Sequence, residues 1–424
     1  MKILVITRNV WDDTNAIGNT LSNFFSSIKN LEFASICFRS GNPNNKLCQE
    51  YYCLTETEVL KKWFFSEKIG KRFSYNFSSV PINLTSAQKN ERSMVRFIRN
   101  HNIRLAYWFS NRIWYSKKWQ NQKLAFFIES FKPDLVVTFV KSSPQYYLMV
   151  KYLRERYNIP VFSWIADDEY TGLLKKKAKR EIRNLKYIID ESAVVTGCSQ
   201  ELCEYYRTIF GCNAMPIYKG CDLSTPVKEF VNKPLKIVYA GNLLYGRMDI
   251  IQRVAHFLDA YDPMGEKVTF EIYSNTELTA EKKDCFEKKI CTKYKGCLDY
   301  DSIKQKLSSA DIVLHVESFE KDQILKTKYS FSTKIIDCLQ SGSVMLAIGP
   351  ANIASIEYVR KIPGAYVVDQ LEKLEEKMSI LLGDSLTFTS RSKSIRNFAQ
   401  KYHNSVLNAK VLEDMLYRII GKES

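Results

Sequence analysis

The chain has 424 residues, of which 45% are hydrophobic and 25% are charged, a balance typical of a globular protein with two or three domains. Its formal net charge of +16 predicts an anionic partner: nucleic acid, an anionic membrane surface or a phosphorylated substrate. The 11 cysteines form no CxxC pair and no cluster with histidine, so we expect no zinc site and the reduced thiols of a cytoplasmic protein. The opening MKILVIT is too short for a signal peptide, and no apolar run is long enough to span a membrane.

The first half of the chain alternates short apolar runs with amphipathic segments. The run ILVIT at 3–7 predicts a buried strand, and the next helix begins near Gly18–Asn19. Further strands are expected at 134–140, 159–166, 192–197 and 213–220, and further helices at 146–157, 171–190 and 199–209. This alternation predicts a parallel, doubly wound sheet.

The second half repeats the same rhythm after a break. Residues 223–234 contain two prolines and mixed charge, and we interpret them as a linker between a first domain, 1–222, and a second domain, 235–395. In the second domain, strands are expected at 235–243, 267–274, 294–297, 310–316 and 344–349, and helices at 249–261, 280–289, 301–309, 333–341 and 351–360. Residues 396–424 are predicted to form C-terminal helices, one of which crosses back to the first domain. The predicted fold class is therefore α/β, with two Rossmann-like domains facing a central cleft.

The stretch YSFSTKIIDCLQSG at 329–342 predicts a helix that begins near Ser332–Thr333. The unpaired N–H groups of a helix N-terminus form an anion site, to which two hydroxyls and the charge of Lys334 would contribute. Asp337 lies further along the same face, where an acid can accept hydrogen bonds from ribose hydroxyls. An alternative of equal weight is that Ser332 and Thr333 only cap the helix and that Lys334 pairs with Asp337.

The segment IVYAGNLLYGRMDII at 237–251 supports the anion-site hypothesis. It reads as a strand, a Gly241–Asn242 turn, and a loop that places Arg247 just before a helix. Arg247 and Lys334 together could hold a diphosphate, although a single arginine on a loop is often only solvated.

These blocks resemble the GT-B glycosyltransferases, in particular the family 4-like enzymes that build bacterial surface polysaccharides. The resemblance depends on AGNLLYGR (240–247), ADIVLHVESF (310–319) and YSFSTKIIDCLQSG (329–342), with support from YKGCD (218–222). It implies a nucleotide-sugar donor bound by the second domain, transfer with retention of configuration, and no metal or other cofactor.

The resemblance also implies roles for individual residues. Arg247 and Lys334 would hold the diphosphate and stabilise it as the leaving group, next to the Gly241–Asn242 turn. Ser332 and Thr333 would add donors, and Asp337 would meet the ribose. The family has two glutamates eight residues apart, whereas here the residue eight before Asp337 is Tyr329. Glu317 is the candidate for the missing sugar contact, and His315, at the end of a buried strand, is interpreted as structural.

The first domain is expected to bind the acceptor, a saccharide or a lipid-linked saccharide. Gly18 and Asn19 lie at the first strand-to-helix turn, where glycine lets a ligand approach the backbone. Asp167 and Asp168 follow another strand and could orient an acceptor hydroxyl, with Asp168 as the catalytic base. The alternatives are a plain helix start for the first pair and helix capping for the second.

Two segments concentrate positive charge in the first domain. Residues 171–190 contain LKKKAKREIRNLK, and residues 90–131 mix Arg and Lys with Trp108, Trp114 and Trp119. Basic residues beside interfacial aromatics predict peripheral association with the inner face of an anionic membrane. The alternative is a solvated helix face with aromatic core residues. No nucleic-acid-binding motif is present, so nucleic acid is not expected as a partner.

The sequence thus predicts a cytoplasmic, membrane-associated glycosyltransferase. Two alternatives remain open at this point: a nucleotide-sugar epimerase of the same fold, and a non-catalytic subunit of a glycosyltransferase complex.

Overall fold

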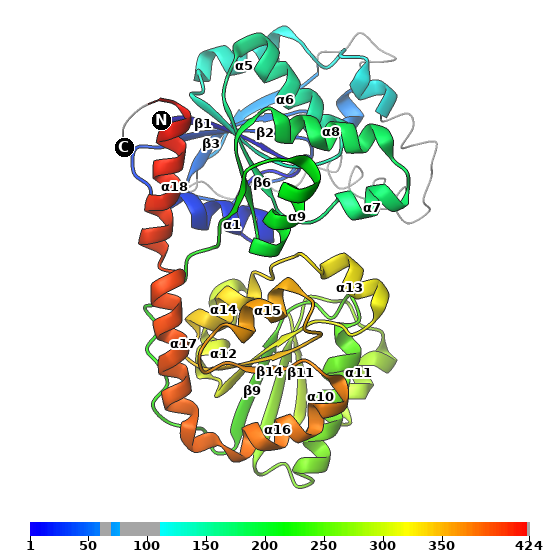
Figure 1. Ribbon diagram of the computed structural model, residues 1–424, viewed down its shortest axis with the longest axis vertical. Coiled ribbons are helices and arrows are strands. Elements are labelled where there is room, and N and C mark those ends of the chain that lie inside the picture. The colour runs from blue at the N-terminus through cyan, green and yellow to red at the C-terminus, as the bar shows by residue number, and fades with distance from the viewer. Residues whose placement is uncertain (60–68, 77–110, 422–424) are drawn as a thin grey trace. The chain divides into compact units, whose positions relative to one another are not determined.

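The computed structural model describes residues 1–59, 69–76 and 111–421, and the chain forms two compact units (Figure 1). Unit 1 comprises Met1–Ile217 together with Ala409–Ser424, and unit 2 comprises Tyr218–Asn408. Helix α18 (Ser405–Ile419) begins in unit 2 and continues into the stretch that belongs to unit 1. The expected linker at 223–234 lies inside unit 2.

Unit 1 is built on an eight-stranded sheet in the order β4-β3-β2-β1-β5-β6-β7-β8. Neighbouring strands are parallel, except that β4 is antiparallel to β3. The strands are β1 (Lys2–Thr7), β2 (Glu32–Cys37), β3 (Cys48–Cys53), β4 (Lys71–Ser74), β5 (Leu135–Phe139), β6 (Val161–Ile165), β7 (Ser192–Gly197) and β8 (Ala214–Pro216). The helices are α1 (Ala16–Phe25), α5 (Gln122–Phe131), α6 (Pro144–Tyr157), α7 (Tyr170–Lys175), α8 (Lys179–Asp190) and α9 (Gln200–Phe210).

The structure differs from the sequence-based expectation at two places in unit 1. Strands β2, β3 and β4 lie where no strand was expected, because polar residues interrupt their apolar pattern; Ser35, for example, is fully buried in β2. The expected helix at 171–190 is wrong as a single element. It is divided into α7 and α8 at Lys177, whose φ of 52° lies in the left-handed region, where a helix cannot continue.

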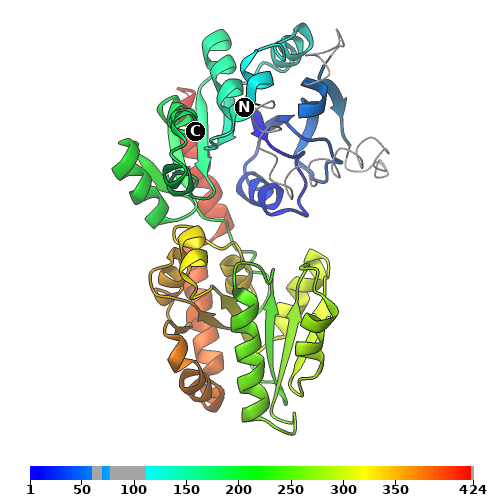
Figure 2. The ribbon, with the colours of Figure 1, turned by 90° about the vertical axis from the view of Figure 1, so that its right-hand side faces the viewer.

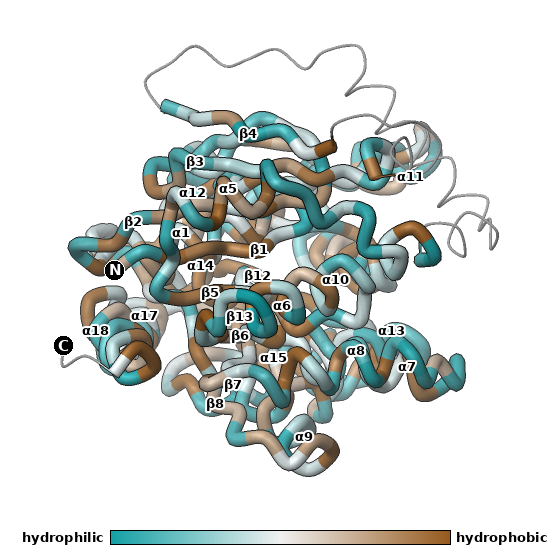
Figure 3. Tube along the Cα trace, turned by 90° about the horizontal axis from the view of Figure 1, so that it is seen from above, coloured by the Kyte–Doolittle hydropathy of each residue, from teal (hydrophilic) through white to brown (hydrophobic). Residues whose placement is uncertain are grey.

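The aromatic residues of the predicted basic-aromatic segment are partly accounted for. Residues 90–110, including Trp108, lie outside the described part of the chain. Trp114 and Trp119 are 1% and 0% exposed and pack against each other with ring centroids 5.9 Å apart. They are core residues, so the interpretation of these two as interfacial aromatics is wrong. The α7–α8 segment is largely hydrophilic (Figure 3).

Unit 2 is built on a six-stranded sheet in the order β11-β10-β9-β12-β13-β14, in which every pair of neighbours is parallel. The strands are β9 (Leu235–Ala240), β10 (Val268–Tyr273), β11 (Thr292–Gly296), β12 (Ile312–Val316), β13 (Val344–Ile348) and β14 (Tyr366–Val368). The helices are α10 (Arg247–Tyr261), α11 (Ala280–Glu287), α12 (Tyr300–Ser309), α13 (Lys321–Thr327), α14 (Lys334–Gln340), α15 (Ala354–Arg360), α16 (Leu374–Gly383) and α17 (Phe388–Tyr402), with 3₁₀ turns at Leu371–Lys373 and Ser385–Thr387.

Helices cover both faces of the unit 2 sheet (Figure 2), which explains why its strands read as continuous apolar runs. Alternate residues of β9 belong to different cores: Ile237 and Tyr239 pack with α10, whereas Val238 packs with α12, α14 and α17. In both units the chain winds outward from a first strand in one direction and then in the other, β1 and β9 being these first strands. The predicted α/β class with two doubly wound sheets is therefore confirmed.

Candidate functional site

The sequence-predicted residues of the second domain gather at one edge of the unit 2 sheet. The sheet reverses its winding between β9 and β12, which are neighbours in the sheet but far apart in the chain. Gly241 and Asn242 directly follow β9, and Glu317 directly follows β12. The carboxyl ends of two strands at such a switch point leave a crevice between the loops that follow them, and ligands of doubly wound proteins bind there.

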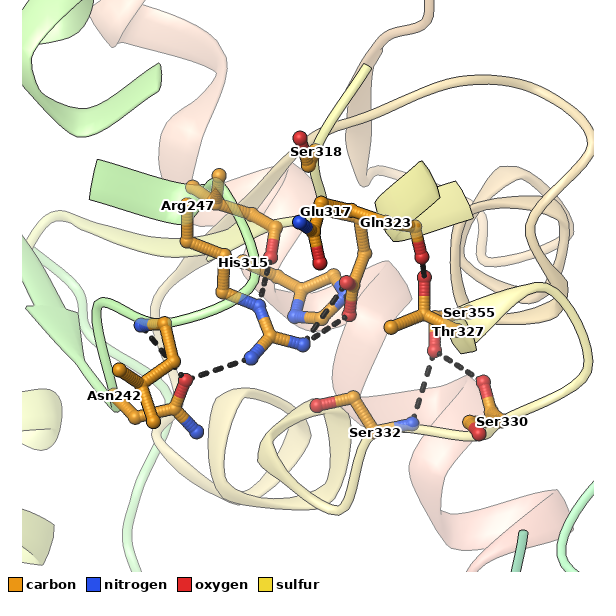
Figure 4. Close-up of polar contacts among 12 residues, drawn as sticks. Asn242, Arg247, His315, Glu317, Ser318, Gln323, Thr327, Ser330, Ser332 and Ser355 are labelled. Carbon is orange, nitrogen blue, oxygen red and sulfur yellow. Dashed lines mark hydrogen bonds and ion pairs between the residues drawn. The ribbon is translucent and has the colours of Figure 1, made fainter. Parts of the chain in front are cut away.

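Arg247 is the first residue of α10, and its side chain is bound on all sides (Figure 4). Nε donates to the Val316 carbonyl oxygen at 3.0 Å, and Nη1 donates to Asn242 Oδ1 at 2.8 Å. Nη2 donates to Glu317 Oε1 and Oε2 at 3.0 and 2.9 Å. The arginine is 7% exposed and the glutamate 2%, so this ion pair is buried. A buried charge that loses its partner is costly, so this pair fixes the guanidinium at the crevice.

The loop that carries the arginine has an unusual backbone. Tyr245 and Gly246 both have positive φ angles, 60° and 70°. A Cβ on Gly246 would stand 2.4 Å from Ser318 Oγ, which explains the glycine. Tyr245 is 48% exposed, and the Arg247 guanidinium carbon lies 5.6 Å from its ring centroid. Left-handed backbone costs a non-glycine residue about 1 kcal/mol, so the loop stores strain at the site.

Lys334 supplies a second cation, and no side chain neutralises it directly. Among the described residues its amine has no hydrogen bond and no ion pair, and it lies 5.4 Å from the centroid of the Tyr239 ring. A Cβ on Gly241 would stand 2.1 Å from Nζ, so the amine occupies the space that the glycine leaves. Burial, and then the charge of Arg247, lower the pKa of Lys334 to about 8, against the opposing effect of Glu317. The structure thus brings Arg247 and Lys334 to the same corner.

His315 adds an unsatisfied polar group to this corner. Its ring is 1% exposed, and neither ring nitrogen has a hydrogen-bond partner within the described part of the chain. Burial and the charges of Lys334 and Arg247 lower its pKa well below the usual value, so the imidazole is neutral. The 3.5 Å approach of Nε2 to Glu317 Oε1 is therefore not an ion pair. A buried donor and acceptor without partners are typical of functional sites.

Glu317 is enclosed by these groups. Burial raises its pKa, and the charges of Arg247 and Lys334 oppose that rise. Both carboxylate oxygens bind Arg247. In the structure Glu317 is the counter-ion of Arg247, and its role as a sugar contact stays a prediction.

Ser332 and Thr333 do not cap the helix with their side chains. Helix α14 begins at Lys334, one residue later than expected, and the Thr333 side chain makes no capping hydrogen bond. The Ser332 amide is already used, because it donates to Ser355 Oγ at 2.9 Å, and that hydroxyl donates to the Ser330 carbonyl at 3.0 Å (Figure 4). Helix α14 has only seven residues, so the helix dipole attracts an anion less strongly than the full charge of Lys334 does.

Asp337 does not pair with Lys334. Its Oδ1 accepts a long hydrogen bond of 3.5 Å from the Tyr300 hydroxyl, which in turn accepts one from Gln340 Nε2 at 3.2 Å. Burial raises the pKa of Asp337, and the charges of Lys219 and Lys334 oppose that rise. The carboxylate thus has one neutral donor and two cations around it.

The residues predicted to bind the acceptor lie in unit 1. The backbone of Asp12 fills the space beside Gly18, since a Cβ there would stand 2.1 Å from the Asp12 carbonyl oxygen. Packing therefore explains this glycine. The Gly18 amide donates to Asn15 Oδ1 at 2.9 Å, and the Asn19 amide donates to the Asn15 carbonyl at 3.0 Å. This is the geometry of a capped helix start.

Asp167 and Asp168 follow β6. Asp167 is exposed. Asp168 Oδ1 accepts from the Thr171 amide at 3.3 Å and from the Tyr206 hydroxyl at 3.4 Å, so it caps the first turn of α7. Next to them, Glu169 binds Lys141, and the charge of Lys141, together with hydrogen bonds from Ser142, outweighs burial and lowers the pKa of Glu169.

Sequence reasoning missed two parts of this site. The unpaired ring nitrogens of His315, which have no hydrogen-bond partner among the residues that the structure describes, could not be read from the sequence, and its interpretation as structural stays a prediction. Tyr245 was not predicted as part of the site, because a tyrosine directly before a glycine in a loop gives no sign that its φ is positive. The described residues contain no group of three or more His, Cys, Asp or Glu side chains arranged to hold a metal ion. None of the described helices is both long and apolar enough to cross a membrane.

The sequence matches no model of a known protein family, and no curated protein matches it. Solved structures do resemble it. Sucrose-phosphate synthase from Thermosynechococcus elongatus superposes with a TM-score of 0.64 at 10% identity, over 99% of each chain. Anabaena HepE in complex with UDP superposes with a TM-score of 0.63 at 12% identity, over 99% of this chain and 100% of HepE.

A third similar structure is WaaG, a glycosyltransferase involved in lipopolysaccharide biosynthesis. It superposes with a TM-score of 0.58 at 10% identity, over 97% of this chain and 99% of WaaG. All three likenesses extend over nearly the whole chain, both units included. The chain therefore has the GT-B fold, in which two Rossmann-like α/β domains follow one another in one polypeptide.

Proposed function

We propose that the protein is a glycosyltransferase and that unit 2 binds its nucleotide-sugar donor. The observation that carries the proposal is the unneutralised ammonium of Lys334 beside the fixed guanidinium of Arg247, at the switch point of the unit 2 sheet. Two cations and one counter-ion leave a net positive corner, which suits a diphosphate. The likeness to HepE, solved with UDP and with UDP-glucose, supports this choice of donor.

The chemistry of the transfer follows from the same groups. As the glycosidic bond to the diphosphate breaks, negative charge develops on the leaving oxygen, and preorganised cations stabilise such charge most effectively. Arg247 is already held in place by four hydrogen bonds, so little reorganisation is needed. Asp337 would meet the ribose, and Tyr300 would hold its carboxylate in place. We further propose transfer with retention of configuration, in the synthesis of a surface polysaccharide or another glycan.

The acceptor is proposed to bind unit 1, with Asp168 as the candidate base. The protein would act at the inner face of the membrane. The α7–α8 segment supports this, because Leu174 is 54% exposed and three lysines, 175–177, follow it. Each basic residue near an anionic surface adds about 1 kcal/mol of attraction.

Titration calorimetry with UDP tests the donor site. Wild-type protein should bind UDP, and Lys334→Ala should weaken binding about 10- to 100-fold, the value of one charge-assisted contact. Lys326→Ala is the matched control, since that exposed lysine of α13 binds only Gln323 among the described residues. Equal affinity of the Lys334→Ala variant would contradict the proposal.

Mass spectrometry of reactions with a panel of nucleotide sugars separates the alternatives. Transfer or slow hydrolysis of one donor is the expected result. Interconversion of the donor without an acceptor would indicate an epimerase instead. Binding of UDP with neither reaction, in the presence of membranes and glycan acceptors, would indicate a non-catalytic subunit.

A further inference from the structure

The imidazole of His315 is a buried titratable group to which the proposed transfer assigns no role. His315 is the fourth residue of β12, and it pairs in register with Ala347 of β13. Its side chain is 1% exposed, so it acts on a ligand only through the residues around it. Neither ring nitrogen has a hydrogen-bond partner in the part of the chain that the structure describes. The ring can therefore accept a proton without breaking a hydrogen bond to any of those residues.

Three charged groups act on this imidazole, each from a different element. Glu317, directly after β12, places Oε1 3.5 Å from His315 Nε2 (Figure 4). Both oxygens of that carboxylate accept hydrogen bonds from Nη2 of Arg247, the first residue of α10. Lys334, the first residue of α14, acts on the ring through its charge. Two cations and one anion leave one net positive charge beside the imidazole.

The other ionisable side chains next to Lys334 do not change this balance. The ring centroid of Tyr239 lies 5.4 Å from the Lys334 amine, and Cys338 lies on the same helix as the lysine. Burial raises the pKa of Tyr239 and the pKa of Cys338, so both side chains stay neutral below pH 7. Asp337 is engaged with Tyr300, whose hydroxyl donates to its Oδ1. The charge at His315 is therefore set by Arg247, Lys334 and Glu317.

Without a donor, these surroundings keep His315 neutral. Burial, then the charge of Lys334, then the charge of Arg247 lower its pKa well below the usual value. Burial favours the neutral form whatever the site contains, whereas the two positive charges act only while they are uncompensated. Two of the three causes of the lowered pKa therefore depend on what is bound at the corner.

A bound diphosphate reverses the charge balance. The diphosphate of a nucleotide sugar carries two negative charges, so its binding changes the net charge of the corner from one positive to one negative. In a buried site of low dielectric, such an excess raises the pKa of a neighbouring base. A proton on His315 would restore neutrality, and it would convert the 3.5 Å approach of Nε2 to Glu317 Oε1 into an ion pair.

We infer that His315 takes up a proton from solvent when the diphosphate of the donor binds, so that donor affinity rises as the pH falls from about 7 to about 5.5. The inference rests on the proposed donor binding and specifies its regulation by pH. No covalent bond between heavy atoms changes: the proton passes from the buffer to a ring nitrogen and returns when the nucleotide leaves. His315 compensates charge and does not contact the reacting atoms.

Calorimetry of the full chain with UDP-glucose at pH 6, in buffers that differ in ionisation enthalpy, tests the inference. The slope of binding enthalpy against buffer ionisation enthalpy gives the number of protons taken up. UDP-glucose has no terminal phosphate that titrates near pH 6, and Lys334, with a pKa of about 8, is already charged there. We expect uptake of roughly 0.3 to 0.8 proton, and binding about threefold tighter at pH 5.5 than at pH 7.

Two matched variants locate the proton. His315→Asn should abolish the uptake and give an affinity that does not change between pH 7 and pH 5.5. His256→Asn is the control and should retain both, because His256 is an exposed residue of α10 whose Nδ1 lies 3.2 Å from Lys289 Nζ. Uptake of wild-type size in His315→Asn would assign the proton to another group, such as Glu317, and would overturn the inference.

Nuclear magnetic resonance of wild-type protein with isotope-labelled histidine reads the protonation state directly. The chain has four histidines, so the ring signals can be assigned by single substitutions, either of His315 or of the other three. At pH 6 the ring-nitrogen shifts of His315 should move from the neutral toward the charged values when UDP-glucose is added. Unchanged shifts with bound UDP-glucose would overturn the inference and leave the donor site standing. Failure to bind either UDP or UDP-glucose would overturn the donor site and the inference with it.

Discussion

The amine of Lys334 lies against the bare Cα of Gly241: a Cβ on that glycine would stand 2.1 Å from Nζ and 2.4 Å from Cε. Gly241 follows strand β9, whereas Lys334 is the first residue of helix α14, and the two meet at the switch point of unit 2. The absence of a side chain on Gly241 therefore leaves space for the Lys334 ammonium, which has no hydrogen bond or ion pair among the described residues.

Gly241→Ala should keep the fold and lose much of the UDP affinity. The added methyl group meets the far end of a flexible side chain, so the lysine can move away at little cost in stability, but its charge moves with it. We expect a drop of about tenfold in calorimetry with an unchanged melting temperature. Gly383→Ala, where nothing lies within 4 Å of the new Cβ, is the control in the same unit. Equal affinities of the two variants would show that the position of the amine is irrelevant.

UDP affinity should depend on pH through Lys334. Its pKa is lowered to about 8, so the ammonium loses its proton as the pH rises through that value and the attraction for diphosphate fades. The phosphate groups themselves are ionised above about pH 7 and add no dependence there. Lys334→Arg keeps its charge and should give a flat profile through pH 8, where the wild type loses affinity. A profile in the wild type as flat as that of the arginine variant would count against this assignment.

Lys334→Met should stabilise the protein, and it should remove the contribution of the Lys334 ammonium to UDP binding. The pKa of this lysine is lower in the folded state than in the unfolded state, so the unfolded state binds the proton more tightly. The charge therefore destabilises the fold below about pH 8, and this cost disappears as pH rises toward the unfolded value. After allowance for partial exposure we expect a gain on the order of 1 kcal/mol at pH 7 in urea unfolding. A loss of stability would mean that the ammonium has a strong partner.

Arg247 and Glu317 should be coupled in a double-mutant cycle. Arg247→Met leaves a buried carboxylate, and Glu317→Leu leaves a buried guanidinium, so each should cost about 3 kcal/mol of unfolding free energy. The double variant should be less destabilised than the sum, by roughly 2 kcal/mol, because neither charge is stranded. Strict additivity in urea unfolding would show that the two charges are solvated independently.

Tyr245→Gly should not destabilise the protein, despite the loss of a large side chain. The φ of 60° at this position destabilises a tyrosine by about 1 kcal/mol, whereas glycine adopts this φ without strain. Leu244→Gly is the control, since Leu244 is 53% exposed and lies outside the set of residues with positive φ. Thermal unfolding of the two variants decides the point, and a lower melting temperature for Tyr245→Gly than for Leu244→Gly would contradict it.

The strands in the middle of each sheet were predictable. They are buried on both faces and therefore consist of consecutive apolar residues, as in ILVIT and DLVVTFV. Strands β2 to β4 were not, because pairing in the sheet, not an apolar pattern, makes EFASIC and CQEYYC extended. The break at Lys177 depends on one left-handed residue, and lysine gives no sign of it.

The candidate site was predictable as a set of residues but not as an arrangement. Arg247 and Lys334 could be predicted because each lies at the start of a helix that the sequence pattern indicates. The ion pair between Arg247 and Glu317 joins residues that are 70 apart in the chain, so no local sequence pattern predicts it. Likewise, the role of Gly18 could not be separated from ligand approach without knowing that the Asp12 backbone fills the space beside it.

The division of α18 between the units has a consequence for biosynthesis. Unit 2 is one continuous stretch, whereas unit 1 needs Ala409–Ser424, in which Leu412 and Leu416 are almost fully buried. On the ribosome, the first 217 residues emerge long before the helix that completes them. Until residues 409–424 have been synthesised, unit 1 exposes the apolar surface that Leu412 and Leu416 cover in the folded protein, and a chaperone that shields nascent chains would bind such a surface.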